Sequence, residues 1–354
     1  MLTGTIACSS LLSSCTTIDE FFTGVHIIAD DTGREVEVPI PSALGKVYFT
    51  SALAQIFCFT IAPDLLAGTA IPFTKDQLDF LPIGSENLAY MGSLTQGSVI
   101  DTEALRLSDT QLVFSISGTD LTDVNVTDAF KLQEQTDIPV FLIDGSFDQI
   151  GDTYRLLGSC LGRPERAEEL AEYCERIYQN VTQAVAQIPA SQRIRYYFAE
   201  GPEGLQTESD TSQHSLAFQV AGGINVAGDA TPTLGHNDLS DTDIEQIQAW
   251  DPEVIISWDW ETRGGADQLI RASSAWSGIS AVRNGRVYAM PHVPFPFCDR
   301  PPGVNRFLGI QWLANLFYPD YYDVDMVEVV RDFYSTCYWR DISRAQAEDI
   351  LGTE

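Results

Sequence analysis

The sequence predicts an α/β protein of two similar lobes with largely parallel sheets, joined by one long helix. The first observation is an internal repeat, because residues 101–115 align without a gap on residues 243–257. The second is that short apolar strands alternate with helical segments, which is typical of parallel sheets. The third is a helical pattern between the two copies, from Pro164 to about Gln187. At 1.5 Å per residue such a helix is about 35 Å long, enough to connect two lobes.

Each copy of the repeat predicts a short capped helix, a turn and a buried strand. Asp101 corresponds to Asp243, and Asp109 corresponds to Asp251. Solenoid repeats recur every roughly 20 to 50 residues, so one unit used twice at this separation indicates two lobes. We expect the copies to be equivalent units in separate sheets, with a ligand-binding cleft between the lobes. The alternative is a chance likeness between two ordinary helix-turn-strand units.

The first lobe is expected to begin with a β-hairpin, in which residues 31–33 supply the turn between strands at 25–28 and 34–38. A helix is expected from Ala52. The remaining strands expected in this lobe outside the repeat are residues 46–50, 65–68 and 139–143.

The long helix has Pro164 in its first turn, and its apolar residues recur at helical spacing. The elements expected after it are strands at 194–199 and 285–289, an apolar helix at 304–317 and a helical region at 325–351. The chain should therefore divide into a signal remnant with a tether, a first α/β lobe, a connecting segment with the bridging helix, and a second α/β lobe. The corresponding ranges are residues 1–24, 25–150, 151–189 and 190–354.

Composition excludes several classes of function. The chain has 354 residues and a formal net charge of −30, with only three lysines among its 20 basic residues. A chain of this charge does not neutralise nucleic-acid phosphates and is repelled by anionic lipid head groups. Motifs of the type HExxH, GxSxG or a Walker loop are absent, and the four histidines are scattered. We therefore expect no catalytic residues, no cofactor and no cluster that binds a bare metal ion.

The amino-terminal segment resembles a lipoprotein processing site, with Leu12-Ser13-Ser14-Cys15 placing Cys15 for lipidation. However, no lysine or arginine occurs before Arg34, so the usual basic start of a signal peptide is missing. The alternative is an ordinary terminus with a chance cysteine. Among the later cysteines, an exported protein could pair Cys160 with Cys174 or Cys298 with Cys337, which leaves Cys58 as a free thiol.

Four segments together carry a family resemblance. They are DTGREVEVP at residues 31–39, LGRPERAEEL at 161–170, AGGINVA at 221–227 and DRPPGVNR at 299–306. In this order and spacing they resemble the solute-binding proteins of metal-chelate ABC importers. That group takes up ferric siderophores, haem, cobalamin and, in some members, molybdate or tungstate.

The resemblance implies a class III periplasmic-binding-protein-like fold, with two Rossmann-like lobes bridged by one rigid helix. It implies an extracytoplasmic monomer, either periplasmic or held to the cell membrane of a Gram-positive organism by a lipid anchor alone. It also implies one surface carboxylate per lobe that docks on the ABC permease dimer. The repeat places Glu103 and Glu245 at corresponding positions, although both could simply favour a helix start electrostatically.

Candidate ligand-binding residues lie on loops at strand ends, where α/β proteins bind ligands. In the first lobe they are Ser51, Ser93, Thr95, Gln96 and Gly97. In the second lobe they are Ser212, His214, Trp258, Arg300 and Arg306. Arginine suits an anionic ligand because its planar fork forms paired, charge-assisted hydrogen bonds. The plain alternatives are helix capping for the hydroxyls, core packing for Trp258, and pairing of Arg300 with Asp299.

Two ligand types fit these residues. A bulky anionic ferric chelate is the first expectation, and it needs an open aromatic cleft, for which Trp258, Trp260, Phe295 and Phe297 are available. Molybdate or tungstate is the second, and it needs a closed site with hydroxyl and N–H donors, such as residues 93–97 and 211–212. More remote alternatives are a metal chelatase-like enzyme and a structural surface lipoprotein.

Overall fold

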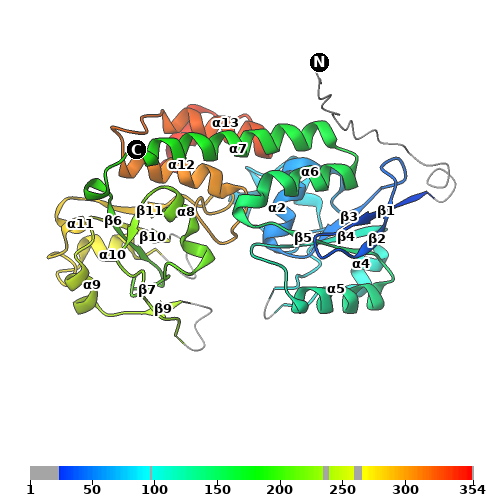
Figure 1. Cartoon of the computed structure of the whole chain (residues 1–354), viewed down its shortest axis with the longest axis horizontal. Helices are drawn as coiled ribbons and strands as arrows, with labels where there is room; N and C mark the ends of the chain where they lie inside the picture. Colours follow the sequence, from blue (N-terminus) through cyan, green and yellow to red (C-terminus); the bar gives the residue numbers. More distant parts are fainter. Residues whose placement is uncertain (1–23, 96–97, 234–238, 259–264, 353–354) are drawn as a thin grey trace, which may run out of the picture.

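The computed structural model describes residues 24–95, 98–233, 239–258 and 265–352, and it contains two α/β lobes with helices packed across one side of both (Figure 1). The first lobe has a parallel sheet in the order β3-β4-β5, and the second has a parallel sheet in the order β11-β10-β6-β8. The predicted fold class is therefore confirmed.

The elements of the first lobe follow the predicted order. They are β1 (Val25–Ala29), β2 (Glu35–Pro39), β3 (Val47–Phe49), α2 (Ala52–Ile61), α3 (Lys75–Leu78), α4 (Thr102–Leu107), β4 (Leu112–Ser117), α5 (Asp123–Thr136), β5 (Val140–Asp144) and α6 (Ile150–Leu161). The expected hairpin is present as the antiparallel pair β1-β2. The expected strand at 65–68 is reduced to an isolated bridge between Leu66 and Val47.

The second lobe follows the long helix α7 (Pro164–Ala186). Its elements are β6 (Arg195–Ala199), β7 (Gln206–Thr207), α8 (Leu216–Val220), β8 (Ile224–Asn225), β9 (Ser240–Asp241), α9 (Ile244–Trp250), β10 (Val254–Trp258), α10 (Ala266–Ala272), α11 (Ser280–Arg283) and β11 (Val287–Met290). Three further helices close the described chain, namely α12 (Asn305–Phe317), α13 (Met326–Tyr338) and α14 (Arg344–Leu351).

The internal repeat is a structural repeat. Asp101 and Asp243 cap α4 and α9. Asp101 accepts from the backbone N–H groups of Glu103 and Ala104, and Asp243 accepts from that of Gln246. After each helix the matched Asp109 and Asp251 adopt the left-handed conformation, with φ of 57° and 44°. The strands that follow, β4 and β10, lie between two neighbours in separate sheets. The same turn is thus built twice by an aspartate, a residue type that tolerates this conformation better than most.

The helices on one side join the lobes into one packed body. The apolar face of α7 is buried, as the helical spacing predicts, and packs against α6 and α12. Helix α13 returns to the first lobe and packs on α2. There Trp339 donates from its indole to the carbonyl of Phe59 at 3.1 Å, and Arg166 of α7 bonds the carbonyl of Thr336. The numbered division into domains stays a prediction.

The loop between β11 and α12 is fixed from both lobes. Asn305 of α12 donates to the carbonyl of Phe295 at 3.0 Å, and Gln77 of the first lobe donates to the carbonyl of Pro294 at 2.9 Å. A Cβ atom built on Gly309 would lie 2.4 Å from the carbonyl oxygen of Phe297, so only glycine lets α12 approach this closely. The loop therefore presents Asp299 and Arg300 from a rigid support.

The five described cysteines are buried and unpaired, so neither disulfide that we considered forms. Burial raises the pKa of the Cys174 and Cys337 thiols well above the ordinary range. Within the described residues, no helix has the length and apolar character needed to cross a membrane.

Candidate ligand-binding site

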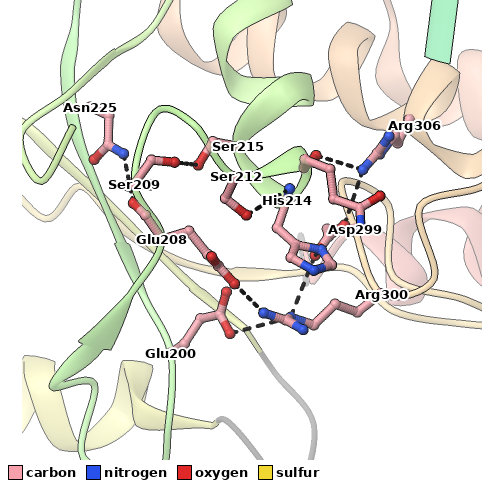
Figure 2. Close-up of polar contacts among 11 residues, drawn as sticks. Glu200, Glu208, Ser209, Ser212, His214, Ser215, Asn225, Asp299, Arg300 and Arg306 are labelled. Atoms are coloured by element: carbon pink, nitrogen blue, oxygen red, sulfur yellow. Dashed lines mark hydrogen bonds and ion pairs between the residues drawn. The ribbon is translucent and has the colours of Figure 1, made fainter. Parts of the chain in front are cut away.

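The carboxyl ends of the two parallel sheets face each other. A Cβ atom built on Gly118, directly after β4, would lie 2.9 Å from Gln213 Oε1 and 3.2 Å from Pro302 Cγ of the second lobe. Glycine at this position lets the two lobes approach closely. Beside this contact, a group of charged residues occupies the second lobe (Figure 2). We call this group the ion cluster, and its members are Glu200, Glu208, His214, Asp299, Arg300 and Arg306.

Asp299 is the centre of the ion cluster and is fully buried. Its Oδ2 lies 2.6 Å from His214 Nδ1, and its Oδ1 lies 3.3 Å from Arg306 Nη2. Burial alone would raise the pKa of Asp299, but the charge and hydrogen bond of His214 and the two guanidinium groups hold it below its ordinary value. Its contribution to stability is therefore complete above the unfolded-state pKa and is lost as the pH falls through the folded-state pKa.

Arg306 forms a buried ion pair with Asp299. Its side chain is fully buried at the start of α12, where Nη2 also donates to the carbonyl of Gln213 at 2.7 Å. The guanidinium carbon lies 5.7 Å from the ring centre of Phe147 in the first lobe. Burial lowers the pKa of Arg306, although Asp299 opposes that shift. The guanidinium of Arg306 has almost no exposed surface, and its role in ligand binding stays a prediction.

Arg300 lies at the edge of the ion cluster with its side chain 14% exposed. Its Nη2 donates to Glu208 Oε1, and its Nε lies 3.4 Å from Glu200 Oε2 and 3.5 Å from Asp299 Oδ2. The guanidinium carbon lies 5.3 Å from the ring centre of Trp258, close enough for a cation–π contact. Figure 2 shows the carboxylates of Glu200 and Glu208 converging on this guanidinium. The backbone of Arg300 is left-handed, with φ of 56°, a conformation that often marks functional sites.

Electrostatics link these groups closely. Burial would lower the pKa of Arg300, but Glu200, Asp299 and Glu208 raise it, so the guanidinium stays charged. Burial raises the pKa of Glu208 above its ordinary value, although Arg300 and His214 oppose that shift.

The sequence analysis did not identify Glu200 or Glu208 as members of the site. Glu200 follows the predicted strand at 194–199 directly, so the strand-end rule could have found it. No comparable signal marks Glu208.

The predicted hydroxyl residues act as local caps. Ser51 Oγ accepts from the N–H of Ala54 at the start of α2, and Ser212 Oγ accepts from the N–H of His214. Ser93 is buried, and its Oγ accepts from the N–H of the exposed Thr95 at 3.3 Å. Gln96 and Gly97 lie outside the described residues, as do Trp260 and Cys15. The structure thus brings Ser212, His214, Trp258 and Arg300 together, while Ser51, Ser93 and Thr95 belong to the facing lobe.

The aromatic residues expected to line an open cleft are in the core. Phe295 and Phe297 have no exposed surface, and Trp258 is 3% exposed. A groove of about 560 Å³ does exist between α3 and α14, but it is lined by residues outside the ion cluster. Within the described ranges, no group of three or more His, Cys, Asp or Glu side chains is arranged to hold a metal ion.

Glu103 and Glu245 are exposed in the first turns of α4 and α9. Figure 1 shows both helices on the side of the lobes away from α7. The two carboxylates therefore occupy equivalent positions on the two lobes, as the repeat predicts.

Residues 95–294 match the family model described as periplasmic binding protein. The chain belongs to the periplasmic binding protein family. Within this family the protein is an extracytoplasmic, non-catalytic receptor, the solute-binding component of an ABC importer. An ABC transporter solute-binding protein from Sulfurospirillum deleyianum has a similar structure, with 26% identity and a TM-score of 0.82. The match covers 92% of this periplasmic binding protein and 99% of that chain.

Two curated relatives have named ligands. The molybdate-binding protein MolA of Haemophilus influenzae is 24% identical over 356 residues, covering 93% of this chain and 96% of MolA. The structure of MolA bound to molybdate gives a TM-score of 0.71 at 20% identity, covering 90% of this chain and 99% of the chain in that structure, which shows the shared fold. A cobalamin-binding protein of Halobacterium salinarum is 27% identical over 221 residues, 60% of this chain and 54% of that protein.

The burial of Arg306 generates a prediction about stability. Arg306→Met should lower the free energy of unfolding by about 3 to 5 kcal/mol, because it leaves the buried Asp299 carboxylate without one of its positive partners. Chemical denaturation monitored by circular dichroism measures the change.

The matched control is Arg344→Met. Arg344 pairs with Asp325 at 2.9 Å, and both side chains are more than half exposed. The exposed pair should contribute at most about 1 kcal/mol. Equal losses in the two variants would show that the ion cluster is not a buried structural centre.

Proposed function

We propose that this receptor captures a small tetrahedral oxyanion of the molybdate or tungstate class and delivers it to an ABC permease. The observation that carries the proposal is the burial of Phe295, Phe297 and Trp258, which removes the aromatic surface that a bulky chelate needs. What remains beside the lobe contact is a set of polar donors. These include the edge of Arg300 and the hydroxyl of Ser212, and both lie beside the imidazole of His214.

The relation to MolA supports the same ligand class, because the similarity spans nearly the whole of both chains. The close approach of Gly118 to Gln213 also suits a small ligand, because it limits the space between the lobes beside the ion cluster. The ferric siderophore complex that the sequence favoured first is the rival ligand, and the binding experiment below separates the two.

The delivery step follows from the repeat. Glu103 and Glu245 would each engage one basic residue on one half of the permease, and Cys15 would hold the receptor at the membrane through a lipid. One chain carries both lobes and both carboxylates, so a monomer is sufficient for this function.

Calorimetry with the purified protein tests the ligand class. We expect one molybdate or tungstate per chain, and no heat with ferric siderophores, haem or cobalamin. Arg300→Met should weaken oxyanion binding by about 1.5 to 3 kcal/mol, the scale of a hydrogen bond to a charged group. Arg344→Met should leave the affinity unchanged. Preferential binding of a ferric chelate would contradict the proposal, and an unchanged affinity in the Arg300 variant would remove Arg300 from the site.

Charge reversal tests docking. The double variant Glu103→Arg with Glu245→Arg should abolish uptake in cells while the affinity for ligand stays the same, because both side chains are exposed and neither belongs to the ion cluster. Glu165→Arg is the matched control, since Glu165 is also an exposed glutamate in the first turn of a helix. All these changes remove a favourable helix-dipole interaction of about 0.3 to 1 kcal/mol. If the double variant transports as well as the control, the carboxylates only stabilise their helices.

A further inference from the structure

The ion cluster has a charge that does not suit a dianion. Three carboxylates and two guanidinium groups give a net charge of −1 when the imidazole is neutral. The charged groups of the cluster around His214 come from several elements. Asp299 and Arg300 lie on the loop before α12, Arg306 is on α12, Glu208 follows β7, and Glu200 follows β6. Placing a dianion beside buried, net negative groups is unfavourable unless positive charge is added.

We propose that anion binding is coupled to uptake of a proton by His214, whose Nε2–H then donates to the anion, with Asp299 as the positioning residue. This inference rests on the proposed oxyanion function and deepens it. It identifies His214, rather than Arg300 alone, as the residue that makes capture depend on pH.

The geometry fixes which ring nitrogen is available. Asp299 Oδ2 lies 2.6 Å from Nδ1, the separation of an ion pair, so the buried carboxylate favours a proton on Nδ1. Nδ1 is itself buried, whereas 13% of the His214 side chain remains exposed, so the accessible edge of the ring carries Nε2. In the neutral ring this atom is an acceptor that repels an oxyanion, and in the protonated ring it is a donor.

The support behind His214 keeps this orientation. Asp299 is held by Arg306, and Arg306 also bonds the carbonyl of Gln213, the residue before His214. The backbone N–H of His214 is bonded to Ser212 Oγ at 3.1 Å. Ring and backbone are therefore both fixed before the ligand arrives, which lowers the entropy lost on binding.

Arg300 cannot supply the missing charge by itself, because Glu208 and Glu200 already occupy its guanidinium. Glu208 is the competing site for a proton, since burial raises its pKa above the ordinary value. Protonation of Glu208 would also make the cluster neutral and would free part of Arg300. The experiment must therefore distinguish an imidazole from a carboxyl as the group that takes the proton.

Titration calorimetry with tungstate in buffers of different ionisation enthalpy measures the protons taken up per anion bound. An imidazole ordinarily changes charge between about pH 5 and 8, so we expect about one proton per anion at pH 8 and fewer at pH 6.5. The affinity for tungstate should rise at least about tenfold as the pH falls from 8 to 6.5, because one proton is linked to binding over most of this range.

Three variants locate the proton. His214→Gln keeps an amide donor but cannot titrate, so proton uptake should vanish and the affinity should become independent of pH. Glu208→Gln should retain the uptake. Asp299→Asn should shift the rise in affinity to lower pH, because the imidazolium loses its carboxylate partner. His26→Gln is the control, since His26 lies on β1 of the first lobe, and it should behave as the wild-type protein does.

The outcomes separate the two proposals. If neither tungstate nor molybdate binds at any pH, the proposed function fails and this inference fails with it. If the anions bind without proton uptake, or if His214→Gln retains the uptake while Glu208→Gln loses it, the oxyanion function stands and the role of His214 is overturned. If the Asp299→Asn variant does not fold, the His214→Gln variant alone decides whether His214 takes up the proton.

Discussion

The rest of the site depends on one buried carboxylate. Asp299 has no exposed surface, and its two oxygens hold His214 on one side and Arg306 on the other. A buried charge is tolerated only when it is paired and hydrogen-bonded, so these partners cannot move independently. Through them Asp299 connects the loop after β11, the start of α12 and the turn before α8. Gln77 of the first lobe donates a hydrogen bond to the carbonyl of Pro294 in this loop, so the loop that carries Asp299 also contacts the first lobe.

This arrangement changes what the arginines do. A sequence with two arginines in a proline-rich loop suggests a positive site for anions, but in the structure Arg306 supports a neighbour and Arg300 is paired with Glu208 and Glu200. The cluster has a net charge of only −1 when the imidazole is neutral, so the uptake of one proton decides whether it accepts an anion. Selectivity can then come from fit and hydrogen-bond geometry rather than from general attraction, which also suits a chain with a formal net charge of −30.

The fold could be predicted because its signals are local or periodic. The repeated aspartates cap α4 and α9 and form the same left-handed turn, and the apolar spacing of α7 gives its buried face. The site could be predicted only in part, because its partners are distant in sequence. Arg300 meets Glu208 across 92 residues, and no pattern in a single sequence reports such a pairing. Phe295 and Phe297 look available in an irregular segment, yet the loop turns both into the core.

The most direct test of the account is a crystal structure of the protein with tungstate, in which the anomalous signal of tungsten locates the ligand without ambiguity. The account predicts a single peak between the lobes, with ligand oxygens within about 3 Å of His214 Nε2 and of an Arg300 nitrogen. A peak in the groove between α3 and α14, or only on the surface, would contradict it.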